Sequence, residues 1–100
     1  MGTFSIRRTA PDRLEAKGAI CFDGAAQALS SGLALLGRGE NTTIDLAQVS
    51  EADSAGLAVL VEWLAHARQM DTTIHYANIP AQILAVARIS ELDALLMDGR

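Results

Sequence analysis

The chain has little of what a membrane, secreted or metal-binding protein usually requires. It contains one cysteine, Cys21, in 100 residues, so it can form neither an internal disulfide nor a cysteine-based metal site. No apolar run approaches the roughly 18 residues that span a bilayer. Residues 1–13 hold no hydrophobic segment of the signal-peptide type. We therefore expect a cytoplasmic protein that binds no metal and does not insert into the membrane.

Aromatic residues and positive charge are also scarce. Two Phe, one Tyr and one Trp are the only aromatic residues, which predicts an aliphatic core. Eight Lys and Arg residues against twelve Asp and Glu residues give a formal net charge of −4. Nucleic-acid binding requires a basic face, and so does electrostatic attraction to anionic lipids. The composition disfavours both kinds of partner.

Motifs that carry catalysis are missing as well. Gly37-Arg38-Gly39 lacks the strand–loop–helix context of a phosphate-binding loop. Ser54 stands in DSAGL, which is not the GxSxG nucleophile elbow, and no histidine is placed as its base. His66 is predicted in mid-helix and His75 in mid-strand. We predict no catalytic residue, no cofactor and no enzymatic activity.

What remains is the pattern of one small α/β domain spanning residues 1–100. Half of the residues are apolar and a fifth are charged, as is usual for a globular chain. Apolar residues at a period of two predict strands at Thr3–Arg8, Arg13–Phe22, Thr42–Val49 and Thr72–Ile79, the second bent or bulged at Gly18. Apolar residues at a period of 3.6 predict helices at Asp23–Leu36, Ser54–Met70, Pro80–Ser90 and within Glu91–Arg100. The order β-β-α-β-α-β-α predicts a mixed, mostly parallel four-stranded sheet with three to four helices, its first strand antiparallel.

The stretch Glu51–Met70 organises this pattern. Asp53 and Ser54 are both strong helix N-cap residues. The apolar residues after them form two sets at helical spacing: Leu57, Leu60, Val61 and Leu64, and then Val59, Trp63 and Met70. Because a helix with one buried face needs only the first set, we interpret the second as a surface for another protein.

Two residues in this stretch each have two interpretations. Ser54 either caps the helix, alone or with Asp53, or presents its hydroxyl as a contact or modification point. Trp63 either covers the flank of the sheet, as buried aromatics do, or faces outward at an interface.

The segment TIDLAQVSEADSAGLAVLVEWLAHAR resembles the signature of the STAS family, the sulfate-transporter and anti-sigma-factor-antagonist domains. The likeness rests on a strand IDL, a short loop, and D-S-x-G-L at the start of a helix, and the element order matches along essentially the whole chain. The resemblance implies a domain that works by docking. It places partner contacts at Ser54, which is also the phospho-acceptor position, and around it at Asp53, Ala55, Gly56 and Leu57, with Leu29 on the first helix. The second apolar set of the central helix adds Trp63 as a candidate partner contact.

Within the family, DSAGLAVLVEWLAHAR and NIPAQILAVARIS are most similar to the branch that serves in the Mla phospholipid-transport system. This implies a non-catalytic subunit that docks on the ATPase of an ABC transporter and lies at the inner membrane through that partner. The alternative is an anti-sigma factor antagonist that binds a kinase-type anti-sigma factor and is switched by phosphorylation of Ser54. Ser54 is compatible with both branches.

Overall fold

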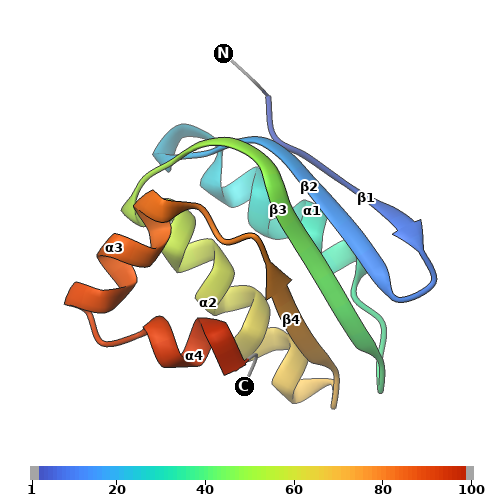
Figure 1. The fold of residues 1–100 in the computed structure, drawn as a ribbon. Coiled ribbons are helices and arrows are strands. Elements are labelled where there is room, and N and C mark those ends of the chain that lie inside the picture. The colour runs from blue at the N-terminus through green and yellow to red at the C-terminus, as the bar shows by residue number, and fades with distance from the viewer. Residues whose placement is uncertain (1–2, 99–100) are drawn as a thin grey trace.

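The structure, a computed structural model, describes residues 3–98 as a four-stranded sheet with helices (Figure 1). Asp98 is described by its backbone only. The elements in chain order are β1 (Ser5–Ala10), β2 (Arg13–Ile20), the 3₁₀ turn η1 (Phe22–Gly24), α1 (Ala25–Leu35), β3 (Asn41–Ala52), α2 (Ser54–Gln69), β4 (Thr73–Ala77), α3 (Ala81–Ile89) and α4 (Asp93–Asp98). The predicted order of strands and helices is confirmed.

The strands lie in the order β1-β2-β3-β4. β1 pairs antiparallel with β2, with Ser5 opposite Lys17. β2 pairs parallel with β3, and β3 pairs parallel with β4. The mixed, mostly parallel sheet with an antiparallel first strand is therefore as predicted.

The bend predicted at Gly18 is also present. Gly18 has a φ of 95°, in the left-handed region that only glycine adopts readily. A Cβ at this position would collide with the backbone of Thr3. The pairing of β2 with β3 shifts register directly after Gly18, so a β-bulge re-aims the end of β2 toward η1.

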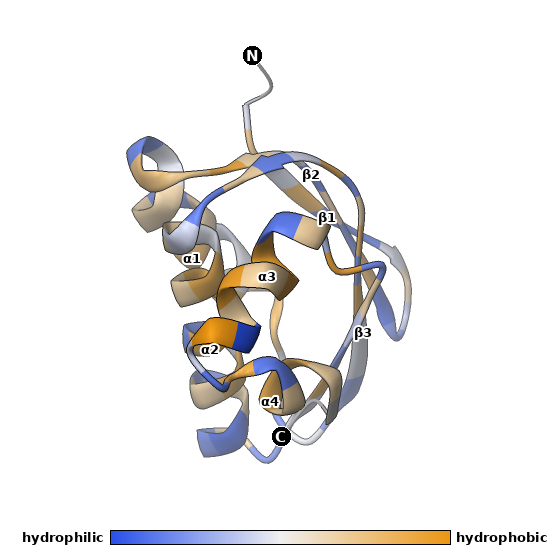
Figure 2. Ribbon diagram, turned by 60° about the vertical axis from the view of Figure 1, so that its left-hand side comes forward, coloured by the Kyte–Doolittle hydropathy of each residue, from blue (hydrophilic) through white to orange (hydrophobic). Residues whose placement is uncertain are grey.

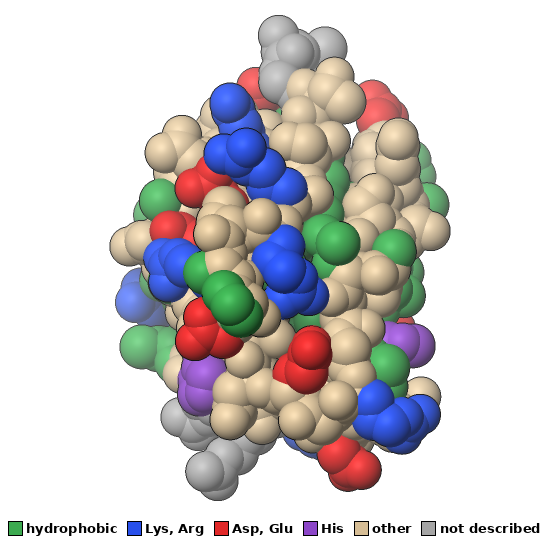
Figure 3. All heavy atoms as spheres, turned by 90° about the vertical axis from the view of Figure 1, so that its right-hand side faces the viewer, with side chains coloured by type: hydrophobic (Ala, Val, Ile, Leu, Met, Phe, Trp, Pro, Cys, Tyr) green, Lys and Arg blue, Asp and Glu red, His purple; other side chains and the backbone are tan. Residues whose placement is uncertain are grey.

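The helices cover one face of the sheet and leave the other open (Figure 2). Alternate residues of β2 are buried beneath the helices, among them Leu14 and Ile20. On the open face, Arg13 Nη2 donates to Asp45 Oδ2 at 2.7 Å. From the side of β1, basic side chains are interspersed with acidic ones (Figure 3). Charges of both signs on the edge strand and its neighbour oppose pairing with a further strand.

Both apolar sets of α2 belong to the core, which corrects the prediction that the second set faces a partner. The residues of the two sets that are fully or almost fully buried are Leu57, Val59, Leu60, Trp63 and Leu64; Val61 and Met70 are half-buried and pack against them. The prediction fails because α2 packs against the sheet and also against α1 and α3, so more than one of its faces is buried.

Trp63 is the contact between α2 and α1. Its side chain is 0 % exposed, and its Nε1 donates to the carbonyl of Leu29 at 3.1 Å. A Cβ on Gly32 would overlap the indole ring, so α1 approaches α2 closely only because residue 32 has no side chain. The interpretation of Trp63 as an outward-facing partner contact is therefore wrong.

This packing predicts the effect of Gly32→Ala. The added methyl group would collide with the indole, and overpacking of this kind costs about 1–3 kcal/mol of unfolding free energy. Thermal denaturation followed by the fluorescence of the single tryptophan measures the loss. Ala34→Gly, the reverse exchange on the exposed side of α1, serves as a comparison, because it changes helix propensity without changing the packing against Trp63. A Gly32→Ala variant as stable as wild type, or a Trp63 emission readily quenched by iodide, would contradict a buried indole.

Candidate partner-docking surface

Asp53 fixes the start of α2. Its Oδ1 accepts from the backbone N–H of Ala55 at 2.8 Å, the hydrogen bond of an N-cap. Its Oδ2 accepts from the backbone N–H of Phe22 in η1 at 3.2 Å. One carboxylate therefore caps α2 and also attaches it to the turn that precedes α1.

Gly56 and Leu57 seat this end of α2 on the sheet. A Cβ at Gly56 would lie 2.7 Å from the carbonyl oxygen of Ile20, so glycine permits α2 to approach the end of β2. Leu57 is 5 % exposed and lies in the core. The prediction that both residues contact a partner is corrected for Gly56, which is buried. Leu57 reaches the surface only at the floor of a groove.

Ser54 is the first residue of α2 and is exposed. The cap is Asp53, and within residues 3–98 no hydrogen bond joins the Ser54 hydroxyl to the rest of the domain. Capping therefore does not explain Ser54. Its hydroxyl is free for a contact or a modification, while Ala55 beside it is half-buried.

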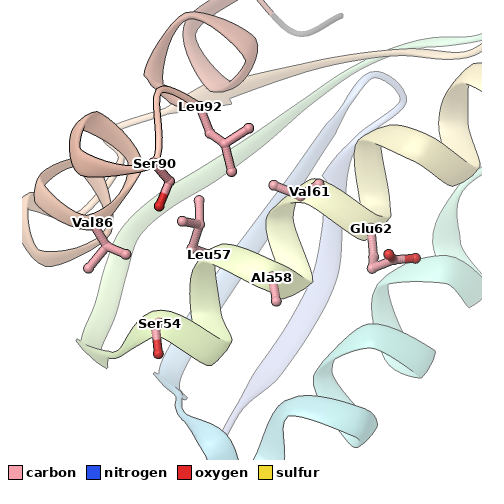
Figure 4. Close-up of a pocket in the computed structure, with 8 residues that line it drawn as sticks. All are labelled: Ser54, Leu57, Ala58, Val61, Glu62, Val86, Ser90 and Leu92. Atoms are coloured by element: carbon pink, nitrogen blue, oxygen red, sulfur yellow. The ribbon is translucent and has the colours of Figure 1, made fainter.

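Ser54, Ala58 and Glu62 follow one another at intervals of four residues and are all exposed. They form a ridge along α2 with a groove on each side. The α2–α3 groove is shown in Figure 4; it is lined by Ser54, Leu57, Ala58, Val61, Glu62, Val86, Ser90 and Leu92. Leu57, Val86 and Leu92 supply apolar side chains to it.

The α1–α2 groove lies on the other side of the ridge. Its residues are Phe22, Ala25, Ala26, Leu29, Ala55, Ala58, Val59 and Glu62. Phe22 is 80 % exposed, although its phase in the sequence predicts a core position at the end of a strand. The strand ends at Ile20, and η1 turns Phe22 outward to form part of the groove. The predicted contact Leu29 is half-buried and lines the same groove.

The surroundings of Cys21 disfavour its thiolate form. Partial burial and the negative charges of Asp53, Glu51 and Asp23 raise the pKa of its side chain. A raised pKa keeps the thiol protonated at neutral pH, whereas a catalytic cysteine needs a lowered one. Within the described residues no three His, Cys, Asp or Glu side chains gather in a way that could hold a metal ion. None of the described helices has the length and hydrophobicity needed to cross a membrane.

Residues 6–97 match a family model described as the Mlab, STAS domain. The chain belongs to the STAS family. STAS domains mediate protein–protein interactions, and the D-S-x-G-L motif of this one consists of the residues just described. Asp53 is the cap, Ser54 the exposed hydroxyl, Gly56 the point of close approach and Leu57 the core residue.

Solved STAS structures share the fold. The anti-sigma factor antagonist SpoIIAA in its unphosphorylated form aligns with a TM-score of 0.64 at 10 % identity, over 87 % of this chain and 83 % of that chain. A sulfate transporter family protein from Wolinella succinogenes aligns with a TM-score of 0.65 at 15 % identity, over 89 % and 75 % of the two chains. No curated protein sequence matches the chain. At such identities the likeness concerns the fold alone.

The assignment of the cap predicts that Asp53 and Ser54 differ in their effect on stability. Asp53→Ala removes both hydrogen bonds of the carboxylate and should lower the unfolding free energy by about 1–2 kcal/mol. Ser54→Ala removes none and should change it by less than about 0.5 kcal/mol. Urea denaturation of the two variants measures the difference. An equal loss for both would show that Ser54 shares the capping role.

Proposed function

We propose that this STAS domain is a non-catalytic cytoplasmic subunit that docks on the ATPase of an ABC-type phospholipid-transport complex of the Mla type. It supports the assembly and activity of that complex and lies at the inner membrane through its partner. The main support for this proposal is an exposed ridge between two grooves with apolar walls, formed by Ser54, Ala58 and Glu62. The Mlab description of the matching family model, over residues 6–97, supports the choice of partner.

The surface suits docking for a physical reason. Phe22 exposes most of its ring next to the small side chains Ala26 and Ala55. Covering such a ring removes apolar area from water, which contributes roughly 25 cal/mol per Å². Aromatic residues, Phe among them, are enriched in the buried centres of protein–protein interfaces. The Phe22 side chain is not part of the hydrophobic core, and the bond from Phe22 to Asp53 uses the backbone N–H.

A second candidate is an anti-sigma factor antagonist that binds a kinase-type anti-sigma factor. The exposure of Ser54 at the start of α2 favours it. A phosphate on Ser54 would add about −1.5 to −2 charge, which a helix N-terminus stabilises, although Asp53 and Glu51 are close in sequence and would oppose it. Such a phosphate would change the ridge without disturbing the cap.

Affinity purification of the full chain from its native cell discriminates the two candidates. Recovery of an ABC ATPase in stoichiometric amount supports the phospholipid-transport proposal. Recovery of a kinase-like anti-sigma factor, with release after phosphorylation of Ser54, supports the second candidate and contradicts the first.

Ser54→Glu separates docking from folding. Acidic residues suit the first turn of a helix, so the variant should melt within a few degrees of wild type. It should nevertheless lose roughly tenfold or more of its affinity for the ATPase, since an unpaired carboxylate buried at an interface costs several kcal/mol. Ser54→Ala is the matched control and should bind nearly as well as wild type. Calorimetry with the purified ATPase measures both, and wild-type affinity of Ser54→Glu would remove Ser54 from the docking surface.

A further inference from the structure

Glu62 is the one charged residue among those described that line the two grooves. Ala58 and Glu62 line both the α1–α2 groove and the α2–α3 groove. None of the described residues that line either groove is Lys or Arg. The rest of both walls is apolar apart from the hydroxyls of Ser54 and Ser90. A carboxylate therefore stands between two surfaces that favour apolar contacts.

Nothing described within the domain neutralises this carboxylate. The ion pairs within residues 3–98 are Arg7–Glu15 and Arg13–Asp45, and both involve the sheet. On α2 the residues three and four positions from Glu62 are Val59, Ala58, Ala65 and His66, and no ion pair joins His66 to it. Glu62 is exposed in the free domain, so water solvates it there. A partner that covers the ridge would remove that water.

The loss of hydration of Glu62 on docking restricts the chemistry of the partner. Burying a carboxylate without a counter-ion is strongly unfavourable. An entirely apolar partner surface would therefore be rejected, and an acidic one still more so. A Lys or Arg side chain within reach of Glu62 would compensate for the lost hydration.

The shape of the α1–α2 groove indicates which kind of segment carries that side chain. Two helices form its walls, and Ala26, Ala55 and Ala58 keep the walls shallow where a third helix would approach. Phe22, the first residue of η1, lies at one end of the groove and offers an exposed apolar ring. A helix laid in a groove of this kind places apolar residues into it at three- and four-residue spacing.

We propose that the α1–α2 groove receives an amphipathic helix of the partner, whose apolar face packs beside Phe22 and Ala58 and whose Lys or Arg pairs with Glu62. This inference rests on the proposed function for the existence of a docked ATPase. It goes beyond that function by naming the chemistry of the segment that docks. Glu62 is then the specificity-determining residue of the surface.

In-cell photo-crosslinking tests the proposal. A benzoylphenylalanine replaces Ser30, an exposed residue of α1 one helical turn after Ala26 and so at the rim of the groove. The full chain is crosslinked in its native cell, and the crosslinked segment of the partner is sequenced by mass spectrometry. We expect one segment with apolar residues at helical spacing and a Lys or Arg on the same face. No crosslink, or a segment without a basic residue, would overturn the proposal.

Charge reversal at Glu62 tests the proposed ion pair quantitatively. Glu62→Lys should lower the crosslink yield roughly tenfold or more, and replacing the basic residue of the partner by Glu should restore it. Asp12→Lys makes the same change of charge in the exposed β1–β2 turn, at the other end of β2, and should leave the yield unchanged. The neutral variant Glu62→Gln should reduce the yield less than Glu62→Lys does. All variants are checked by thermal denaturation, and equal yields for Glu62→Lys, Glu62→Gln and wild type would contradict the role of Glu62.

The two proposals fail separately. If the crosslinked segment is basic and helical but belongs to a protein other than an ABC ATPase, the proposed function is wrong and the chemistry assigned to the groove stands. If it belongs to an ABC ATPase but is insensitive to Glu62→Lys, the proposed function stands and the inference about Glu62 is wrong.

Discussion

The proposed docking surface depends on the position of one carboxylate, that of Asp53. It accepts hydrogen bonds from Ala55 and from Phe22, residues that lie on different elements. Through these bonds the start of α2 and the turn before α1 keep a fixed relation to each other. Phe22 and Ser54, the exposed residues at this end of the two helices, therefore belong to one continuous surface. Without the bond to Phe22, the wall of the α1–α2 groove would lose its anchor near η1.

Further along the two helices, side-chain packing fixes the distance between α1 and α2. Trp63 lies against Gly32, and its Nε1 donates to Leu29. The indole thereby determines how closely α1 and α2 approach each other in the middle of the groove. The core and the proposed docking surface use different faces of α2: Trp63 and Leu60 face the interior, while Ser54, Ala58 and Glu62 face solvent. A substitution on the ridge can therefore change binding without changing the core.

The sequence predicts well those features that depend on local chemistry. The N-cap at Asp53 or Ser54, the bend at Gly18 and the order of elements all follow from residue types at short spacing. It could not decide between Asp53 and Ser54 as the cap, because both side chains can accept the same hydrogen bond. In the structure Asp53 has the extended backbone of an N-cap and its carboxylate accepts from Ala55, whereas Ser54 is already the first helical residue.

The errors concern features that depend on neighbours distant in sequence. The number of helices that surround α2 is not encoded in its own periodicity, so the sequence of α2 does not distinguish a buried Trp63 from an interface residue. The sequence signal for this contact is Gly32, since a glycine inside a helix often marks a close contact. The sequence predicts a strand position for Phe22 because the strand pattern continues through Cys21, whereas the chain leaves the sheet at Ile20.

Hydrogen–deuterium exchange of the full chain, alone and bound to its purified ATPase, tests the central claim most directly. If the domain docks through the ridge and the α1–α2 groove, protection on binding should concentrate in residues 22–30 and 54–66. Strands β1 and β2 on the open face of the sheet should exchange as in the free protein. Protection confined to residues 5–17, with residues 54–66 unchanged, would place the partner on the opposite face and contradict the account.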